Sequence, residues 1–73
     1  MATAVEVSCV TRIGEVAGGV YRHLEVEGPT SLSKLVKEID APRDIVMQSL
    51  GWLAREDKIN IDEESRSKIV SLR

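Results

Sequence analysis

The sequence contains one cysteine and one histidine among its 73 residues. A single cysteine excludes an internal disulfide and a zinc site built from several cysteines, and it is typical of a reducing compartment. We interpret Cys9 as a small buried apolar residue and His23 as a solvated or partly covered ring. Because the chain offers no convincing set of catalytic residues and no pair of metal ligands, the sequence indicates no enzyme, no metal or cofactor site and no small-molecule ligand.

Long apolar runs and an excess of one charge are also missing. No stretch approaches the roughly 18 apolar residues of a membrane helix, and residues 1–10 lack the basic start of a signal peptide. We therefore expect a cytoplasmic protein with no membrane contact. Lysine and arginine number 10 against 12 aspartates and glutamates, a net charge of −2. A nucleic-acid-binding protein usually shows a basic excess or a basic stripe, so the composition does not favour one.

The short chain allows one domain and little stability to spare. A domain of 73 residues buries only about 60% of its unfolded surface, so it needs a well-packed core or a partner. We expect the domain to cover residues 11–73. Residues 1–10 are expected to be a tail or a short added strand, because Val5 and Val7 alternate with polar neighbours.

Apolar residues recur at helical spacing in three successive segments. The spacing predicts helices over residues 11–26, 32–39 and 42–56. Gly28 and Pro29 end the first helix, Ser31 caps the second, and Pro42 suits the first turn of the third. Two helices joined by a three-residue break are typical of a helix-turn-helix.

After residue 57 the apolar spacing changes from helical to alternating. Ile59 and Ile61 predict one strand, residues 63–67 a polar loop, and residues 69–72 a returning strand, with a very short strand possible over residues 29–31. This order predicts a mainly α (α+β) winged helix-turn-helix: a three-helix bundle closed by a C-terminal β-hairpin wing. The predicted core consists of Ile13, Val16, Ala17, Val20, Leu24, Leu35, Val36, Ile39, Val46, Leu50, Leu53, Ile59 and Ile69.

Two stretches of the sequence resemble a known family. Residues 13–18, IGEVAG, and residues 51–59, GWLAREDKI, are similar to a family of small bacterial and archaeal winged helix-turn-helix domains of unknown function. The resemblance covers about residues 11–73 and implies the winged-helix fold. Tyr21 stands where the family is expected to have tryptophan. The family is described as DNA-binding by analogy of fold, and a fold alone does not establish a function.

The third helix and the wing are the surfaces on which a winged helix contacts duplex DNA. Outward-facing donors are expected there: Arg43, Gln48 and Arg55 on the helix, with Arg66 and Lys68 on the wing. Asp44 opposes them, since a carboxylate near the helix start repels phosphate. Cations and carboxylates balance over both the motif and the wing, so we expect a single copy to bind DNA weakly.

Other residues suggest contact with a second copy or another protein. Gly14 and Gly18 lie four residues apart beside Tyr21, where another backbone could approach closely. Ile45 and Trp52 widen the apolar face of the third helix: either both belong to the core, or Trp52 is half exposed and anchors an interface. We expect weak self-association, with a homodimer as its simplest form.

The sequence therefore favours a non-enzymatic binding module and leaves two functions open. One is a DNA-binding or transcription-associated module, which is preferred on the analogy of fold. The other is a protein-interaction or dimerisation module that does not bind DNA.

Overall fold

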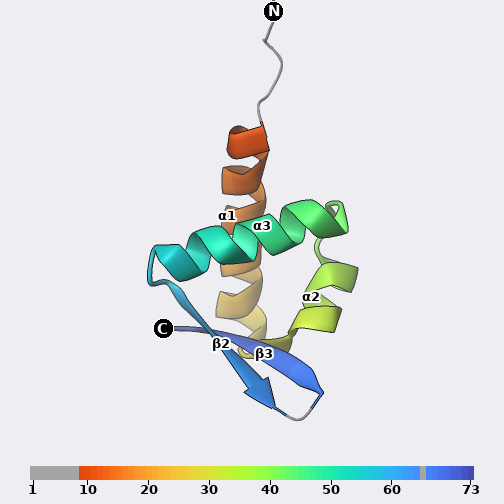
Figure 1. Ribbon diagram of the computed structural model, residues 1–73, viewed down its shortest axis with the longest axis vertical. Helices are drawn as coiled ribbons and strands as arrows, with labels where there is room; N and C mark the ends of the chain where they lie inside the picture. Colours follow the sequence, from red (N-terminus) through yellow and green to blue (C-terminus); the bar gives the residue numbers. More distant parts are fainter. Residues whose placement is uncertain (1–8, 65) are drawn as a thin grey trace, which may run out of the picture.

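The computed structural model describes residues 9–64 and 66–73, and these form a helical bundle with a small sheet at one end (Figure 1). The elements are α1 (Cys9–Glu27), β1 (Thr30–Ser31), α2 (Leu32–Glu38), α3 (Arg43–Arg55), β2 (Ile59–Glu64) and β3 (Ser67–Leu72). The three strands form an antiparallel sheet in the order β1-β3-β2. The predicted winged helix-turn-helix architecture, including the short strand before the second helix, is confirmed.

Helix α1 begins two residues earlier than the sequence predicted. The expected N-terminal tail falls mostly on residues 1–8, which lie outside the described residues, whereas Cys9 and Val10 already belong to α1. The first turn of α1 extends beyond α3 (Figure 1). Cys9 is therefore exposed, and the expectation that it is buried was wrong. Val10 is 60% exposed for the same reason.

The end of α1 is closed by local hydrogen bonds, as the sequence predicted from its glycine and proline. Gly28 adopts a φ of 77°, a backbone conformation that favours glycine, and its N–H donates to the Leu24 carbonyl over 2.9 Å. The Thr30 hydroxyl then donates to the Gly28 carbonyl over 2.8 Å. These contacts turn the chain from α1 directly into β1.

The break between α2 and α3 follows from capping and from proline. The Ser31 side chain accepts a hydrogen bond from the Lys34 N–H over 3.2 Å, which caps the start of α2. At its other end the Ile39 N–H donates to the Leu35 carbonyl over 2.9 Å. Pro42 occupies the position just before α3 and limits backward extension of that helix. The two helices are thus separated by residues 39–42.

The core lies where α1, α2 and α3 meet the sheet. Its buried members are Ala17, Val20, Leu24, Leu35, Val46, Leu50, Leu53, Ile59 and Val70, with Val16, Leu32, Val36, Ile39, Ala41 and Leu72 packed against them. Two predicted core residues need correction, because Ile13 and Ile69 are half-buried and do not belong to this cluster or to the residues packed against it. In β3 the core position is taken by Val70, which is fully buried.

The register of the hairpin explains this shift from Ile69 to Val70. Ile59 pairs with Leu72, and Ile61 pairs with Val70. Directly paired residues share a face of an antiparallel sheet, so Val70 lies on the same face as Ile59 while Ile69 lies on the other face. The hairpin is also longer than predicted. Glu63 pairs with Lys68, so most of the polar stretch assigned to a loop lies in the strands.

Helix α3 packs across α1 through a small polar residue. Ser49 is fully buried, and its hydroxyl lies 3.1 Å from the Ile13 carbonyl of α1 and 2.8 Å from the Ile45 carbonyl of its own helix. A serine at this crossing lets the two helix backbones approach closely while the hydroxyl remains hydrogen-bonded. Ser49 thus lies where α3 crosses α1, and Figure 1 shows the two helices crossing.

Candidate binding surfaces

The donors predicted on α3 all lie at the surface. Arg43, Gln48 and Arg55 are exposed, and neither arginine makes an ion pair with any residue in the described ranges. Asp44 is exposed as well, and its Oδ1 accepts a hydrogen bond from the Ile45 N–H over 2.9 Å. Helix α3 therefore presents two arginines and one carboxylate.

The two cations of the wing are not equivalent. Lys68 makes an ion pair with Glu63, directly opposite on β2, with 3.0 Å between Nζ and Oε2. Arg66 lies in the turn of the hairpin and is exposed, without an ion pair to a described residue. Both side chains of the Lys68 pair are largely exposed, so the pair contributes little to stability. It does, however, neutralise one of the two predicted phosphate contacts on the wing.

Most of the residues predicted to form an interface converge on one hollow between α1 and α3. The hollow has a volume of about 370 Å³ and is lined by Gly14, Ala17, Gly18, Tyr21, Arg22, Trp52, Leu53 and Lys58. The sequence offered the glycine ridge of α1 and the Trp52 flank of α3 as separate surfaces. The structure brings both to the same place.

Ile45 does not belong to this surface and is a correction to the predicted set. It is only 4% exposed, whereas Trp52 is 45% exposed. The two residues are seven apart and share a side of α3, but they lie on opposite sides of Ser49, where α3 crosses α1. One half of that side is covered and the other half opens onto the hollow.

Two cations at the hollow were not singled out in the sequence. Arg22 comes from α1, and Lys58 lies between α3 and β2. The Arg22 Nη1 lies 3.8 Å from the place where a Cβ on Gly18 would stand, so the guanidinium lies close to the glycine ridge. Only the fold joins Lys58 to α1, since 36 positions separate it from Arg22 in the sequence. The one sequence signal was the helical spacing from Gly18 to Arg22, which places both residues on the same side of α1.

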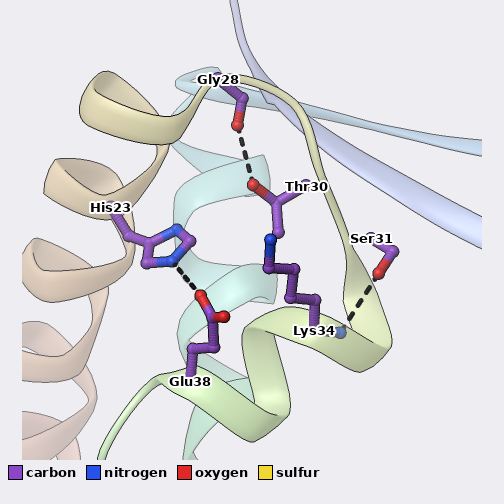
Figure 2. Close-up of polar contacts among 6 residues, drawn as sticks. All are labelled: His23, Gly28, Thr30, Ser31, Lys34 and Glu38. Atoms are coloured by element: carbon purple, nitrogen blue, oxygen red, sulfur yellow. Dashed lines mark hydrogen bonds and ion pairs between the residues drawn. The ribbon is translucent and has the colours of Figure 1, made fainter.

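A polar contact joins the C-terminal half of α1 to α2. His23 Nε2 lies 2.8 Å from Glu38 Oε1 (Figure 2), and the His23 side chain is 16% exposed, which agrees with a partly covered ring. The hydrogen bond with His23 holds the pKa of Glu38 below its ordinary value, because it favours the ionised carboxylate. In the described part of the chain, His23 Nδ1 is buried and has no hydrogen-bond partner. The contact fastens α2 against α1.

Neither a metal site nor a membrane span emerges from the described residues. Within residues 9–64 and 66–73, no three histidine, cysteine, aspartate or glutamate side chains gather as metal ligands would. No described helix combines the length and the apolar character needed to cross a membrane.

Comparison with known proteins identifies the family and the fold. Residues 9–72 match the family described as winged helix-turn-helix domain (DUF2582). The chain is 38% identical over 65 residues to the uncharacterised protein MJ1608 of Methanocaldococcus jannaschii, covering 85% of this chain and 91% of that protein. It is also similar in structure to AF1382 from Archaeoglobus fulgidus, with a TM-score of 0.64 over 85% of this chain and 68% of that one. At 14% identity, the second likeness shows a shared fold alone. The chain belongs to the winged helix-turn-helix family DUF2582, the kind of small domain of unknown function that its sequence resembled.

Proposed function

We propose that this chain is a winged-helix module that binds duplex DNA through α3 and the turn of the wing. The observation that carries the proposal is the exposure of Arg43, Gln48 and Arg55 on the helix that a winged helix places in the major groove. Exposed glutamine and arginine side chains can pair with base edges or with phosphates. Arg66, exposed at the hairpin turn, supplies the contact that the wing makes beside the groove.

The ion pairs of the structure limit how strong this binding is. Lys68 is held by Glu63. Within the described part of the chain, the proposed DNA surface then keeps three exposed arginines without an ion pair: Arg43, Arg55 and Arg66. Three phosphate contacts give a slope of about −3 for the logarithm of affinity against the logarithm of salt concentration, well short of a strong binder. A single copy therefore binds weakly, and two copies on one duplex would bind more tightly.

The test is a titration of labelled duplex, followed by fluorescence anisotropy at several salt concentrations. Arg66→Ala should weaken binding and reduce the salt slope by about 1, because one phosphate contact is lost. Lys68→Ala on the same wing is the matched control, and its effect should be smaller because Glu63 already neutralises Lys68.

Two substitutions should act in the opposite direction. Glu63→Gln releases Lys68 and should tighten binding. Asp44→Asn should do the same, since it removes a negative charge and keeps the oxygen that accepts from the Ile45 N–H. If the duplex does not bind at low salt and high protein concentration, or if these four variants bind equally, the DNA-binding proposal is wrong for this domain.

The second candidate function is a protein-interaction module that self-associates, and the exposure of Trp52 favours it. A large aromatic side chain that is 45% exposed is the kind of residue that anchors protein interfaces. Val10 adds exposed apolar area on the projecting first turn of α1. Sedimentation velocity over a range of protein concentrations tests this candidate. A monomer at the highest concentration contradicts self-association, and a dimer that dissociates on dilution supports it.

A further inference from the structure

The hollow between α1 and α3 combines an open volume with an unusual set of side chains. Its volume of about 370 Å³ falls within the range of small-molecule sites in proteins. Two of its lining residues are aromatic, Tyr21 and Trp52, and two are cations, Arg22 and Lys58. Among the described residues the lining contains no carboxylate, in a chain that carries more acidic than basic residues overall.

The side chains of Arg22 and Lys58 make no ion pair within residues 9–64 and 66–73. The ion pairs there join His23 to Glu38, Lys68 to Glu63 and Arg73 to Asp57, and none of them involves Arg22 or Lys58. Two cations at one hollow that make no ion pair favour an anionic group there. An arginine and a lysine together suit a carboxylate or a phosphate.

The apolar part of the lining suits a flat ring. Trp52 keeps almost half of its surface exposed, and Tyr21 lines the same hollow from α1. Gly14 and Gly18 line the hollow, and the space beside Gly14 is open, because a Cβ there would meet nothing within 4 Å. Offset stacking on an aromatic side chain requires a planar partner that can approach closely, and the glycines leave that room.

The charges argue against a two-fold symmetric dimer through this hollow, so the self-association considered above would use a contact that is not two-fold or that lies outside the hollow. In a two-fold symmetric dimer the same patch of both copies meets itself. Arg22 and Lys58 of one copy would then face the same two cations of the other, with no carboxylate from the lining between them. Like charges brought together in this way cost binding energy.

We propose that the hollow binds a small planar anion, that is, a ring system carrying a carboxylate or a phosphate. The ring stacks on Trp52 beside Tyr21, and the anionic group lies between Arg22 and Lys58. None of the residues lining the hollow is a proposed DNA contact (Arg43, Gln48, Arg55 and Arg66), so this proposal does not depend on the DNA-binding proposal. It also goes beyond the sequence, which indicated no small-molecule ligand.

The single tryptophan of the chain makes the test direct. Trp52 alone supplies the indole N–H signal in heteronuclear NMR and the tryptophan fluorescence, so either readout reports on the hollow. Benzoate represents an aromatic carboxylate and adenosine monophosphate a nucleotide, with benzamide and adenosine as their neutral counterparts. At least one anion should shift the Trp52 signal in a saturable way. Its neutral counterpart should bind about tenfold more weakly or not at all. The compound that binds, benzoate or adenosine monophosphate, shows whether the anion is an aromatic carboxylate or a nucleotide.

Matched variants separate the hollow from general effects of charge and bulk. Arg22→Gln and Lys58→Gln should each weaken anion binding by about three- to tenfold. Arg12→Gln, which removes an exposed cation of α1 outside the hollow, should leave binding unchanged. Gly18→Leu should block the hollow, whereas Gly19→Leu should not, since Gly19 is outside the lining and a Cβ there meets nothing within 4 Å. Each variant is accepted only after its unfolding transition shows that it is folded.

The proposal is wrong if neither anion shifts the Trp52 signal at the highest concentration tested. It is also wrong if the neutral compounds bind as well as the anions. The same holds if Arg12→Gln weakens binding as much as Arg22→Gln. Sedimentation of the same samples tests the alternative that a second copy of the chain fills the hollow. If Gly18→Leu converts a dimer to a monomer, that alternative is correct and the small-anion proposal is wrong. None of these measurements uses DNA, so their failure leaves the DNA-binding proposal to its own test.

Discussion

The two ends of α1 differ in what surrounds them. Toward its C-terminus, Leu24 is buried in the core, His23 contacts Glu38 of α2, and Gly28 closes the helix with a positive φ. Toward its N-terminus and along the hollow, Val10 is exposed, Gly14 has open space beside it, and Trp52 of α3 is half exposed. Most of the stability of the domain should therefore come from the C-terminal end of α1, its closed end. This leaves the side of α1 that faces the hollow, its open flank, available for binding.

The largest expected effect comes from shortening an apolar side chain at each end of α1. Leu24→Ala should lower the free energy of unfolding by about 2–5 kcal/mol, because it leaves a cavity in the core. Val10→Ala should change the same quantity by less than about 0.5 kcal/mol, since Val10 is largely exposed. Urea denaturation followed by circular dichroism measures both. Equal losses at the two positions would remove the distinction between the ends.

Replacing two glycines by alanine tests the same comparison, and the two variants should change the free energy of unfolding in opposite directions. Gly28→Ala should lower the free energy of unfolding by about 1 kcal/mol, because alanine is strained at a φ of 77°. Gly19→Ala, inside α1, should raise it by up to about 1 kcal/mol, because alanine favours the helix and its Cβ meets nothing within 4 Å. The same urea experiment decides. A loss at Gly19 would mean that this face of α1 is packed more closely than the structure indicates.

The smallest expected effect is the pH dependence at the closed end. The hydrogen bond with His23 lowers the pKa of Glu38 below its ordinary value of 4.5. A carboxyl with a lowered pKa stabilises the fold fully above that ordinary value, and the contribution is lost as pH falls through the lowered pKa. Glu38→Gln should therefore make the free energy of unfolding less dependent on pH in acid solution. Glu25→Gln, an exposed carboxylate of α1, serves as the control. An unchanged pH dependence in Glu38→Gln would show that the His23 contact does not stabilise the fold.

The fold was largely predictable because local signals decide it. Helical spacing, the Ser31 cap and the change to alternation after residue 57 each have a local cause, and each is confirmed. The errors arose where tertiary context decides. The alternation in 69–72 was ambiguous until pairing with β2 fixed the register and placed Val70 in the core. Cys9 was assigned to the interior because nothing local shows that α1 extends past α3.

The candidate surfaces were predictable only in part. Residues on one helix, such as Gly14, Gly18 and Tyr21, share a flank by spacing alone. That this flank faces Trp52 and Lys58 depends on where α3 crosses α1, at the buried Ser49. The pairing of Lys68 with Glu63 likewise depends on the hairpin register. Composition could count these charges but could not say which of them are already paired.

The central claim is that the open flank of α1 binds rather than stabilises, and one unfolding experiment tests it most directly. Urea denaturation compares the chain with the double variant Arg22→Gln, Lys58→Gln, each with and without the anion that responds in the Trp52 titration. Without the anion, the two proteins should agree in free energy of unfolding to within about 0.5 kcal/mol, because both side chains are exposed. With the anion at about 100 times its dissociation constant, the unsubstituted chain should gain about 2.7 kcal/mol and the variant much less. A variant that is unstable without the anion, or that gains as much from it, would contradict the claim.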